Sequence, residues 1–249
     1  VLGSSRAGNV RAAFFERPFV NMAGAATDLE SLRLLVDRML AVHRPKVVLL
    51  GLDFWWLTAG VPAGRPERIV QPSLLDASTL RAPWRWLVQG RIAPADMLAP
   101  LQHRLRADRY GLEAQLRDTG YGPDGSLYEG AVLDGRRPAP DHAFARTLRE
   151  LESGSGVWAG SLAPDRERLE AFAEICCRLR SRGIRTIVFL PPLATPVLGA
   201  LADRNGGDAG WLSALRQGLL DCGVESMDFS DPRVYGSGDC EMMDGLPGG

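Results

Sequence analysis

The 249-residue sequence contains few of the residue types that carry metal, redox or nucleic-acid chemistry. It has three histidines and a single lysine, Lys46. The four cysteines (Cys176, Cys177, Cys222 and Cys240) show no CxxC spacing and no accompanying histidine cluster, so we predict no metal site. Walker and GxGxxG spacings are missing, which predicts no nucleotide cofactor. A formal net charge of −1 gives no reason to expect a nucleic-acid partner.

Long apolar runs are missing as well. No stretch approaches the ~20 apolar residues that a membrane-spanning helix needs, and no signal peptide is recognisable. We therefore expect this segment itself to be soluble. The chain starts at Val1, without a methionine and inside a strand-like pattern, which leaves room for an N-terminal membrane anchor before it. A disulfide between Cys222 and Cys240 can form if the protein resides in an oxidising compartment, and the sequence does not decide this.

Short apolar runs alternate with amphipathic helical patterns. The candidate strands are 1–3, 18–23, 46–53, 184–192 and, more weakly, 224–230. Helices are predicted after Thr27 or Asp28, after Asp165 and over 211–223. Continuous apolar character is typical of strands covered on both faces. The alternation predicts an α/β fold with a doubly wound parallel sheet.

The stretch 55–163 breaks this alternation, because it is rich in proline, glycine, arginine and tryptophan. We interpret 1–249 as one domain with an insertion subdomain of about 55–163 on the carboxyl edge of the sheet. Within it, "GYGPDGSLYEG" (120–130) favours a hairpin with a Pro-Asp-Gly turn over a glycan contact.

Several polar segments follow strands and are expected to meet at the carboxyl edge, where open α/β sheets bind ligands. They are Gly-Ser-Ser at 3–5, the loop 21–26, Asp53 and Asp244. A serine on a tight turn can be an exposed nucleophile, with backbone N–H groups stabilising an oxyanion. The alternatives are a plain turn with an N-cap serine and, more weakly, a phosphate cradle.

Taken together, "VLGSSRAG", "NMAGAAT", "VVLLGLD" and "MMDG" resemble the SGNH/GDSL hydrolase family. The resemblance is closest to its bacterial cell-envelope branch, which includes alginate O-acetyltransferases and the D-alanyl transfer protein of teichoic-acid synthesis. It implies a flavodoxin-like three-layer α/β/α sandwich with a long insertion after the third strand. It also implies a serine nucleophile, an oxyanion hole from three loops and a closing Asp-x-x-His, in a periplasmic or cell-envelope protein.

Carried over by position, the resemblance makes Ser5 the nucleophile and the first oxyanion donor, through its own N–H. Ala26 takes the position of the glycine donor. The third donor, normally an asparagine, falls on Leu52, with Asp53 next to it. Leucine has no donor and an ionised aspartate only accepts, so Asp53 is an incomplete replacement. Arg6 can either pair with Asp53 or clamp an anionic sugar, and the ion pair is the favoured interpretation.

Three further residues are candidates for substrate contact beside Arg6. Asn21 opens the second motif, and Trp55 and Trp56 directly follow the third predicted strand. Aromatic faces at that edge suit a sugar ring. The alternative is that both tryptophans are core residues that anchor the insertion.

The last motif departs from the family. Asp244 is present, but Pro247 stands where the general-base histidine should be. The three histidines lie elsewhere, at His43, His103 and His142, and His142 is the one that an insertion can bring over the serine. The domain is then catalytically silent, or takes its base from the insertion or a partner chain, or ends in an altered sequence.

The favoured prediction is a serine esterase or O-acyltransferase acting on acetyl esters of a cell-envelope polysaccharide, with a membrane acyltransferase as a possible partner. The alternative is a catalytically silent SGNH-fold protein that binds glycan or scaffolds an acyltransferase complex. A phosphate-binding α/β domain is a more distant alternative.

Overall fold

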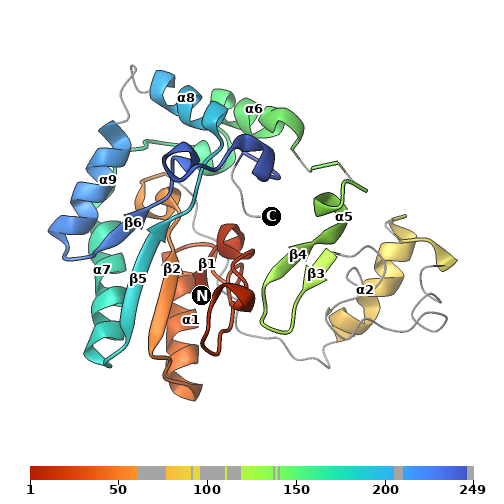
Figure 1. The fold of residues 1–249 in the computed structure, drawn as a ribbon, viewed down its shortest axis with the longest axis horizontal. Coiled ribbons are helices and arrows are strands. Elements are labelled where there is room, and N and C mark those ends of the chain that lie inside the picture. Colours follow the sequence, from red (N-terminus) through yellow and green to blue (C-terminus); the bar gives the residue numbers. More distant parts are fainter. Residues whose placement is uncertain are drawn as a thin grey trace.

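The computed structural model describes residues 1–60, 77–90, 92–95, 110, 119–136, 138–139, 141–204 and 210–245. Its centre is a four-stranded sheet in the order β1-β2-β5-β6, in which every neighbouring pair is parallel. The strands are β1 (Leu2–Gly3), β2 (Val47–Gly51), β5 (Arg185–Leu190) and β6 (Ser226–Asp228). The α/β class with a parallel sheet is therefore confirmed (Figure 1).

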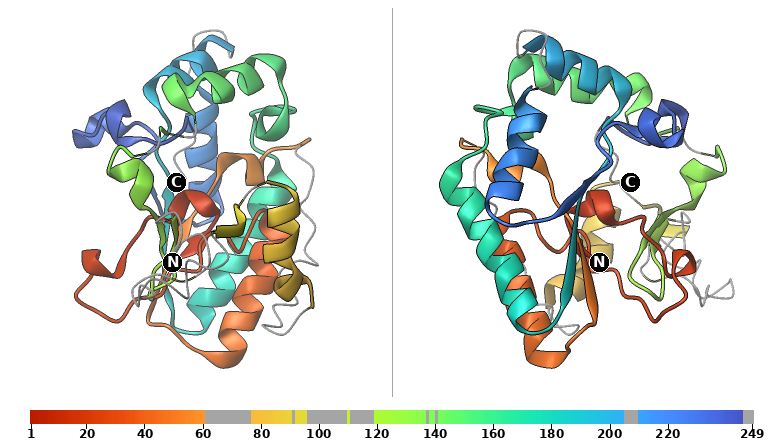
Figure 2. Two further views of the ribbon diagram at one scale, coloured as in Figure 1. Left: turned by 90° about the vertical axis from the view of Figure 1, so that its right-hand side faces the viewer. Right: turned by 60° about the vertical axis from the view of Figure 1, so that its left-hand side comes forward.

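Three helices cover one face of this sheet (Figure 2). They are α1 (Leu29–Val42), α7 (Arg166–Ser181) and α9 (Gly210–Asp221). The predicted caps are present: Asp28 accepts from the Ser31 amide at 2.7 Å, and Asp165 accepts from the Arg168 amide at 3.0 Å. From β1 onward the strands are added in one direction, so right-handed crossovers put all three helices on the same side.

The predicted strand at 18–23 is not a strand in the structure, although the chain there lies along the outer edge of β1. The Val1 amine donates to the Val20 carbonyl at 2.7 Å, and the Met22 amide donates to the Val1 carbonyl at 2.9 Å. The Gly24 amide continues this spacing with a 2.9 Å bond to the Gly3 carbonyl. The segment therefore pairs with β1 over a few residues, and it is too short and irregular to extend the sheet.

The crossover from β1 to this edge segment lies on the face opposite the three helices (Figure 2). It contains only two short 3-10 turns, η1 (Ser5–Ala7) and η2 (Ala12–Phe14). Among the described residues, the second helical layer of a three-layer sandwich is thus replaced by a loop. The prediction of helices on both faces is not met there.

The burial of the strand side chains follows from this one-sided cover. Side chains toward the helices (Val48, Leu50, Val188 and Leu190) are buried. Alternate side chains on the other face stay half-buried at Leu49, Ile187 and Phe189, and Met227 is 49% exposed. Successive residues of a strand point to opposite faces, so the continuous apolar runs are split between a packed face and an open one.

The insertion leaves and re-enters the domain at one place, where Thr58 forms an antiparallel bridge with Pro164. Its described elements are α2 (Ala77–Val88), β3 (Thr119–Tyr121), β4 (Leu127–Glu129), α5 (Gly130–Leu133) and α6 (Ala145–Ser153). The predicted hairpin is confirmed as the antiparallel pair β3–β4. Helix α8 (Thr195–Arg204), after β5, was not predicted.

No helix in the described ranges is both long and apolar enough to cross a membrane. All four cysteines are free thiols, so the Cys222–Cys240 disulfide is not formed.

Candidate functional site

The serine turn lies directly at the carboxyl end of β1. Gly3 has φ +142°, and a Cβ there would sit 2.6 Å from the Gly51 carbonyl oxygen, so β1 and β2 approach too closely for a side chain. Ser4 caps η1, and its hydroxyl accepts from the Arg6 amide at 3.2 Å. The N-cap interpretation therefore fits Ser4, and it leaves Ser5 exposed as the first residue of the turn.

Among the described residues, two backbone N–H groups of the motif segments have no acceptor. Within the described part of the chain, neither a carbonyl nor a side chain accepts from the amides of Ser5 and Ala26. Buried N–H groups are normally paired, and Ala26 is fully buried. Gly24, two residues earlier, is the neighbour of the serine: its missing Cβ would lie 3.8 Å from Ser5 Cα. The Gly24 amide donates to the Gly3 carbonyl, so it is not free to stabilise an oxyanion.

Arg6 and Asp53 form a buried ion pair beneath the turn. The Arg6 Nη1 to Asp53 Oδ1 distance is 2.9 Å, and the two side chains are only 4% and 0% exposed. Arg6 Nη2 donates to the carbonyls of Pro191, at 3.0 Å, and Pro192. The guanidinium also lies over the Trp55 ring, 5.4 Å from its centroid. Arg6 therefore links the ends of neighbouring strands inside the fold. It does not serve to bind an anionic sugar, which was the other interpretation of the sequence.

The same pair removes Asp53 as an oxyanion donor, because its side chain accepts from Arg6. Burial raises the pKa of the Asp53 carboxyl, and the charge of Arg6 together with hydrogen bonding from Ser4 opposes that shift.

Asp244 belongs to the same rim. The Ala194 amide, just past the end of β5, donates to the Gly245 carbonyl at 3.3 Å and so places the Asp244 segment at this edge. Burial lowers the pKa of Arg6, and the carboxylates of Asp53 and Asp244 both oppose that shift. Arg6 directly follows Ser5, so the serine turn and the segment 244–245 lie at the same edge of the sheet.

The turn before α6 packs on this C-terminal segment. A Cβ on Gly245 would lie 2.8 Å from the Thr147 side chain, in the first turn of α6. Thr147 in turn donates its hydroxyl to Asp141 at 2.6 Å, and His142 follows Asp141 in the short helix η5 (His142–Phe144). The next two residues, Ala143 and Phe144, have φ of +52° and +58°, a strained conformation for residues other than glycine.

The other histidines do not meet the site in the described structure. His43 is the exposed C-cap of α1, before β2 and thus at the amino edge of the sheet. His103 and Pro247 lie outside the described residues.

Asn21 is a structural residue and is almost fully buried. Its amide nitrogen donates to the carbonyls of Ala7, Gly8 and Val10 at 2.8–3.0 Å, and its side-chain oxygen accepts from the Ala23 amide at 2.8 Å. These contacts fold the serine loop back on itself. They leave Asn21 no side-chain group for the substrate contact that was predicted.

Trp55 and Trp56 differ from the substrate-binding expectation as well. Both lie in η3 (Phe54–Leu57), and both are buried in the main hydrophobic core. Phe54 packs between Trp55, Trp158 and Trp211 at ring-centroid distances of 5.0–5.4 Å. The aromatic run after β2 therefore anchors the insertion, which was the alternative interpretation.

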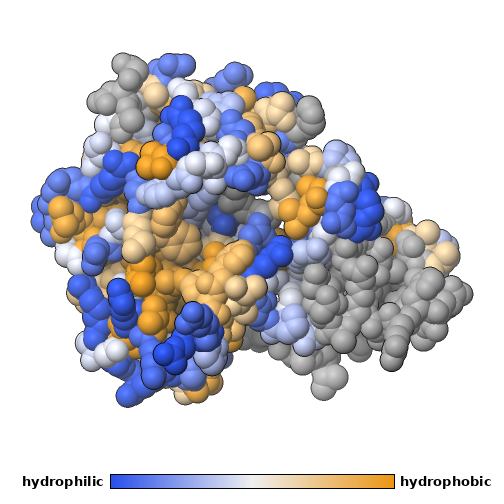
Figure 3. Space-filling model, viewed as in Figure 1, coloured by the Kyte–Doolittle hydropathy of each residue, from blue (hydrophilic) through white to orange (hydrophobic). Residues whose placement is uncertain are grey.

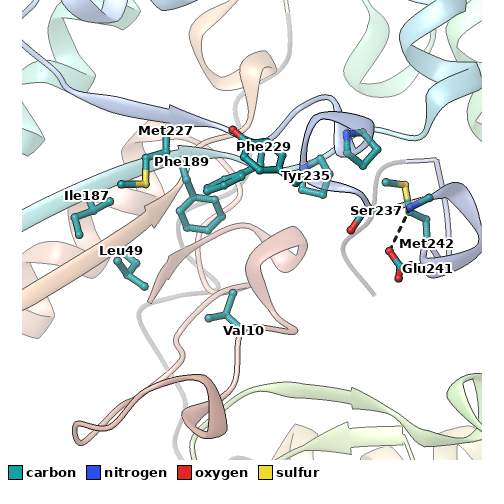
Figure 4. A pocket seen from close by; sticks show the side chains of 13 residues that line it. Val10, Leu49, Ile187, Phe189, Met227, Phe229, Tyr235, Ser237, Glu241 and Met242 are labelled. Carbon is teal, nitrogen blue, oxygen red and sulfur yellow. Dashed lines mark hydrogen bonds between the residues drawn. The ribbon is translucent and has the colours of Figure 1, made fainter.

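An apolar groove was not predicted. It has a volume of about 580 Å³ and lies on the open face of the sheet, where hydrophobic residues gather (Figures 3 and 4). Its lining consists of Val10, Leu49, Ile187, Phe189, Pro192, Met227, Phe229, Pro232, Tyr235, Ser237, Gly238, Glu241 and Met242. The sequence holds no direct signal for it, because apolar strand residues look the same whether or not a helix covers them.

Comparison with known proteins returns no match: neither a family model, nor a curated protein, nor a solved structure resembles this chain closely enough. Within the described residues, no cluster of three or more His, Cys, Asp or Glu side chains could hold a metal ion.

Proposed function

We propose that this protein is a serine esterase or O-acyltransferase of the SGNH/GDSL type, with Ser5 as its nucleophile. The observation that carries the proposal is an exposed serine at the carboxyl end of β1, whose own amide, like that of Ala26, has no acceptor in the described chain. The Ser5 hydroxyl oxygen attacks the carbonyl carbon of an ester, and the amides of Ser5 and Ala26 stabilise the oxyanion. The alcohol leaves with a proton, and water or a second hydroxyl then takes the acyl group.

A flavodoxin-like order of strands at β1, without the second helical layer, is part of this proposal. Its support is the segment 20–24, which pairs with β1 on the side opposite β2. The direction in which strands are added then reverses at β1. A reversal of strand order marks the ligand crevice of open α/β sheets, and Ser5 follows β1 at that point.

For the general base we propose His142. It replaces the histidine that the family places three residues after Asp244. Support comes from the packing of Gly245 against Thr147 in the first turn of α6, because η5, which contains His142, directly precedes that helix. The left-handed conformation of Ala143 and Phe144 adds to it, because strained backbone concentrates at functional sites.

The substrate class in this proposal is an acyl ester, foremost an acetyl ester, of a cell-envelope polysaccharide. The polysaccharide, the periplasmic or envelope location and a membrane acyltransferase partner rest on the resemblance of the motifs alone. Trp55 and Trp56 are buried and therefore cannot stack on a sugar ring, so they no longer support a sugar as the substrate.

Hydrolysis of p-nitrophenyl acetate and labelling by a fluorophosphonate test the nucleophile. We expect Ser5→Ala to abolish both, and Ser153→Ala, an exposed serine at the end of α6, to retain both. His142→Ala should lower the rate by about a hundredfold or more, as removal of a general base does, and His43→Ala should not.

Equal rates of hydrolysis for the wild type and Ser5→Ala would show that Ser5 is not the nucleophile. Absence of both labelling and hydrolysis in the wild type would favour the catalytically silent alternative, for which Pro247 at the histidine position is the supporting observation. An active His142→Ala would place the base elsewhere.

A further inference from the structure

The two ends of the groove on the open sheet face differ: one is lined by apolar side chains only, and the other carries the few polar ones. Leu49, Ile187 and Met227 form one end, and Ser237 and Glu241 lie at the other (Figure 4). Two polar side chains of the lining already have partners within the chain. Glu241 accepts from the Gly238 amide at 3.3 Å. The Tyr235 hydroxyl donates to the Asp228 carbonyl at 2.7 Å and is also occupied.

The polar end of the groove adjoins the rim that carries the serine turn. Pro192 lines the groove, and its carbonyl oxygen accepts from Arg6. Val10, from the same loop as Ser5, forms the wall opposite the sheet, and Met242 lies two residues before Asp244. The groove therefore runs from the candidate site down the open face.

Neither an acetyl group nor a sugar matches this groove. A volume of about 580 Å³ falls within the ~300–1,000 Å³ of ordinary ligand sites and far exceeds an acetyl group. A sugar needs many hydrogen-bonding partners, and nearly every lining side chain is apolar. The groove requires a ligand that the proposed function does not provide.

The dimensions suit a chain. Along β5 the lining residues are Ile187, Phe189 and then Pro192, just past the strand end, a span of roughly 15 Å at ~3.3 Å per residue. Side chains of the strands form the floor of the groove, where the rings of Phe189 on β5 and Phe229 after β6 stand 6.4 Å apart. A ligand that follows this floor is long, narrow and apolar, with its polar group at the rim.

We propose that this groove binds one unbranched hydrocarbon chain of a lipid, with the polar end of the chain at the rim beside the serine turn. The apolar end lies over Leu49, Ile187 and Met227, the positions left open because a loop replaces a helical layer. Binding needs only apolar contact along the groove and does not depend on the reactivity of Ser5.

Isothermal titration calorimetry with sodium laurate below its micelle concentration tests this proposal. We expect one laurate per chain for the wild type and equally for Ser5→Ala, and no binding of sodium acetate, because the chain supplies the affinity. Met227→Glu should weaken laurate at least about tenfold, since it places a charge against the apolar chain. The matched control is Leu220→Glu, on α9, where a leucine that is 63% exposed, against 49% for Met227, lies on the helical side of the sheet.

Absence of laurate binding to a folded wild type would overturn the proposal, and so would equal affinities for Met227→Glu and the wild type. A wild-type dimer that Met227→Glu converts to a monomer, without laurate binding, would assign the groove to a second copy of the chain and overturn it as well. Failure of Ser5 to react with esters leaves the laurate result unchanged, so the two proposals fail separately.

Discussion

At the scale of single residues, the ion pair between Arg6 and Asp53 is the most constrained contact at the candidate site. Arginine remains charged in proteins, so a change at Asp53 removes the carboxylate that is hydrogen-bonded to a buried positive charge. The remaining Arg6 contacts, to the carbonyls of Pro191 and Pro192, do not neutralise that charge. The pair ties the serine turn to the ends of β2 and β5 and thereby orients Ser5.

We expect Asp53→Asn to lower the free energy of unfolding by about 3–5 kcal/mol, the usual loss when one partner of a buried pair is removed. Urea denaturation followed by circular dichroism measures it. The control is Glu30→Gln, which breaks an exposed ion pair with Arg33 and should change stability by less than about 1 kcal/mol. A loss below 1 kcal/mol for Asp53→Asn would show that the pair is not essential to the fold.

At the scale of elements, the start of α6 depends on Asp141. Partial burial works to raise the pKa of this carboxyl, but the Thr147 hydroxyl and the amides of Arg146 and Thr147 outweigh burial and lower the pKa. These bonds hold the left-handed turn at Ala143 and Phe144 against its strain.

This lowered pKa predicts a pH dependence of stability. A carboxyl with a depressed folded-state pKa stabilises the fold above its unfolded pKa of about 3.9, and the contribution disappears as the pH falls through the folded value. The stability difference between wild type and Asp141→Asn should therefore be largest near neutral pH and shrink below about pH 4. Thr147→Val, which removes one donor, should show a smaller difference. A difference that is constant with pH would contradict the assignment.

The helix caps show what local sequence can predict. Asp28 and Asp165 cap their helices through bonds to residues three positions ahead, so the signal is contained in a few neighbouring letters. The segment 18–23 shows the opposite. Its apolar residues resemble a strand, but pairing depends on the distant chain at Val1, and only a few bonds form.

At the scale of the whole molecule, the insertion hairpin docks against the serine loop. The Asp124 carboxylate accepts from the Ala12 amide at 2.7 Å, and the Asp124 carbonyl accepts from the Asn21 amide at 2.6 Å. The Leu127 amide donates to the Gly8 carbonyl at 2.8 Å. The loop that carries Ser5 therefore takes its shape from residues more than 100 positions away.

We expect Asp124→Ala to speed amide hydrogen exchange over residues 8–21, because the loop loses its side-chain acceptor at Ala12, and to leave exchange in α7 unchanged. Mass spectrometry of peptides from the two regions measures both. Asp134→Ala, which breaks only an exposed pair with Arg136 in the same insertion, serves as control. Faster exchange over the whole chain would indicate general destabilisation instead of a local tether.

The sequence by itself determined the α/β class, the helix caps at Asp28 and Asp165, and the hairpin. Each follows from local periodicity or from hydrogen bonds between near neighbours, which are encoded within a few residues. Only the tertiary structure decided that Trp55, Trp56 and Asn21 face inward, that Arg6 pairs with Asp53, and that one face of the sheet stays open. Those outcomes depend on which distant segments cover a residue, and burial is a property of the assembled fold that no single stretch of sequence contains.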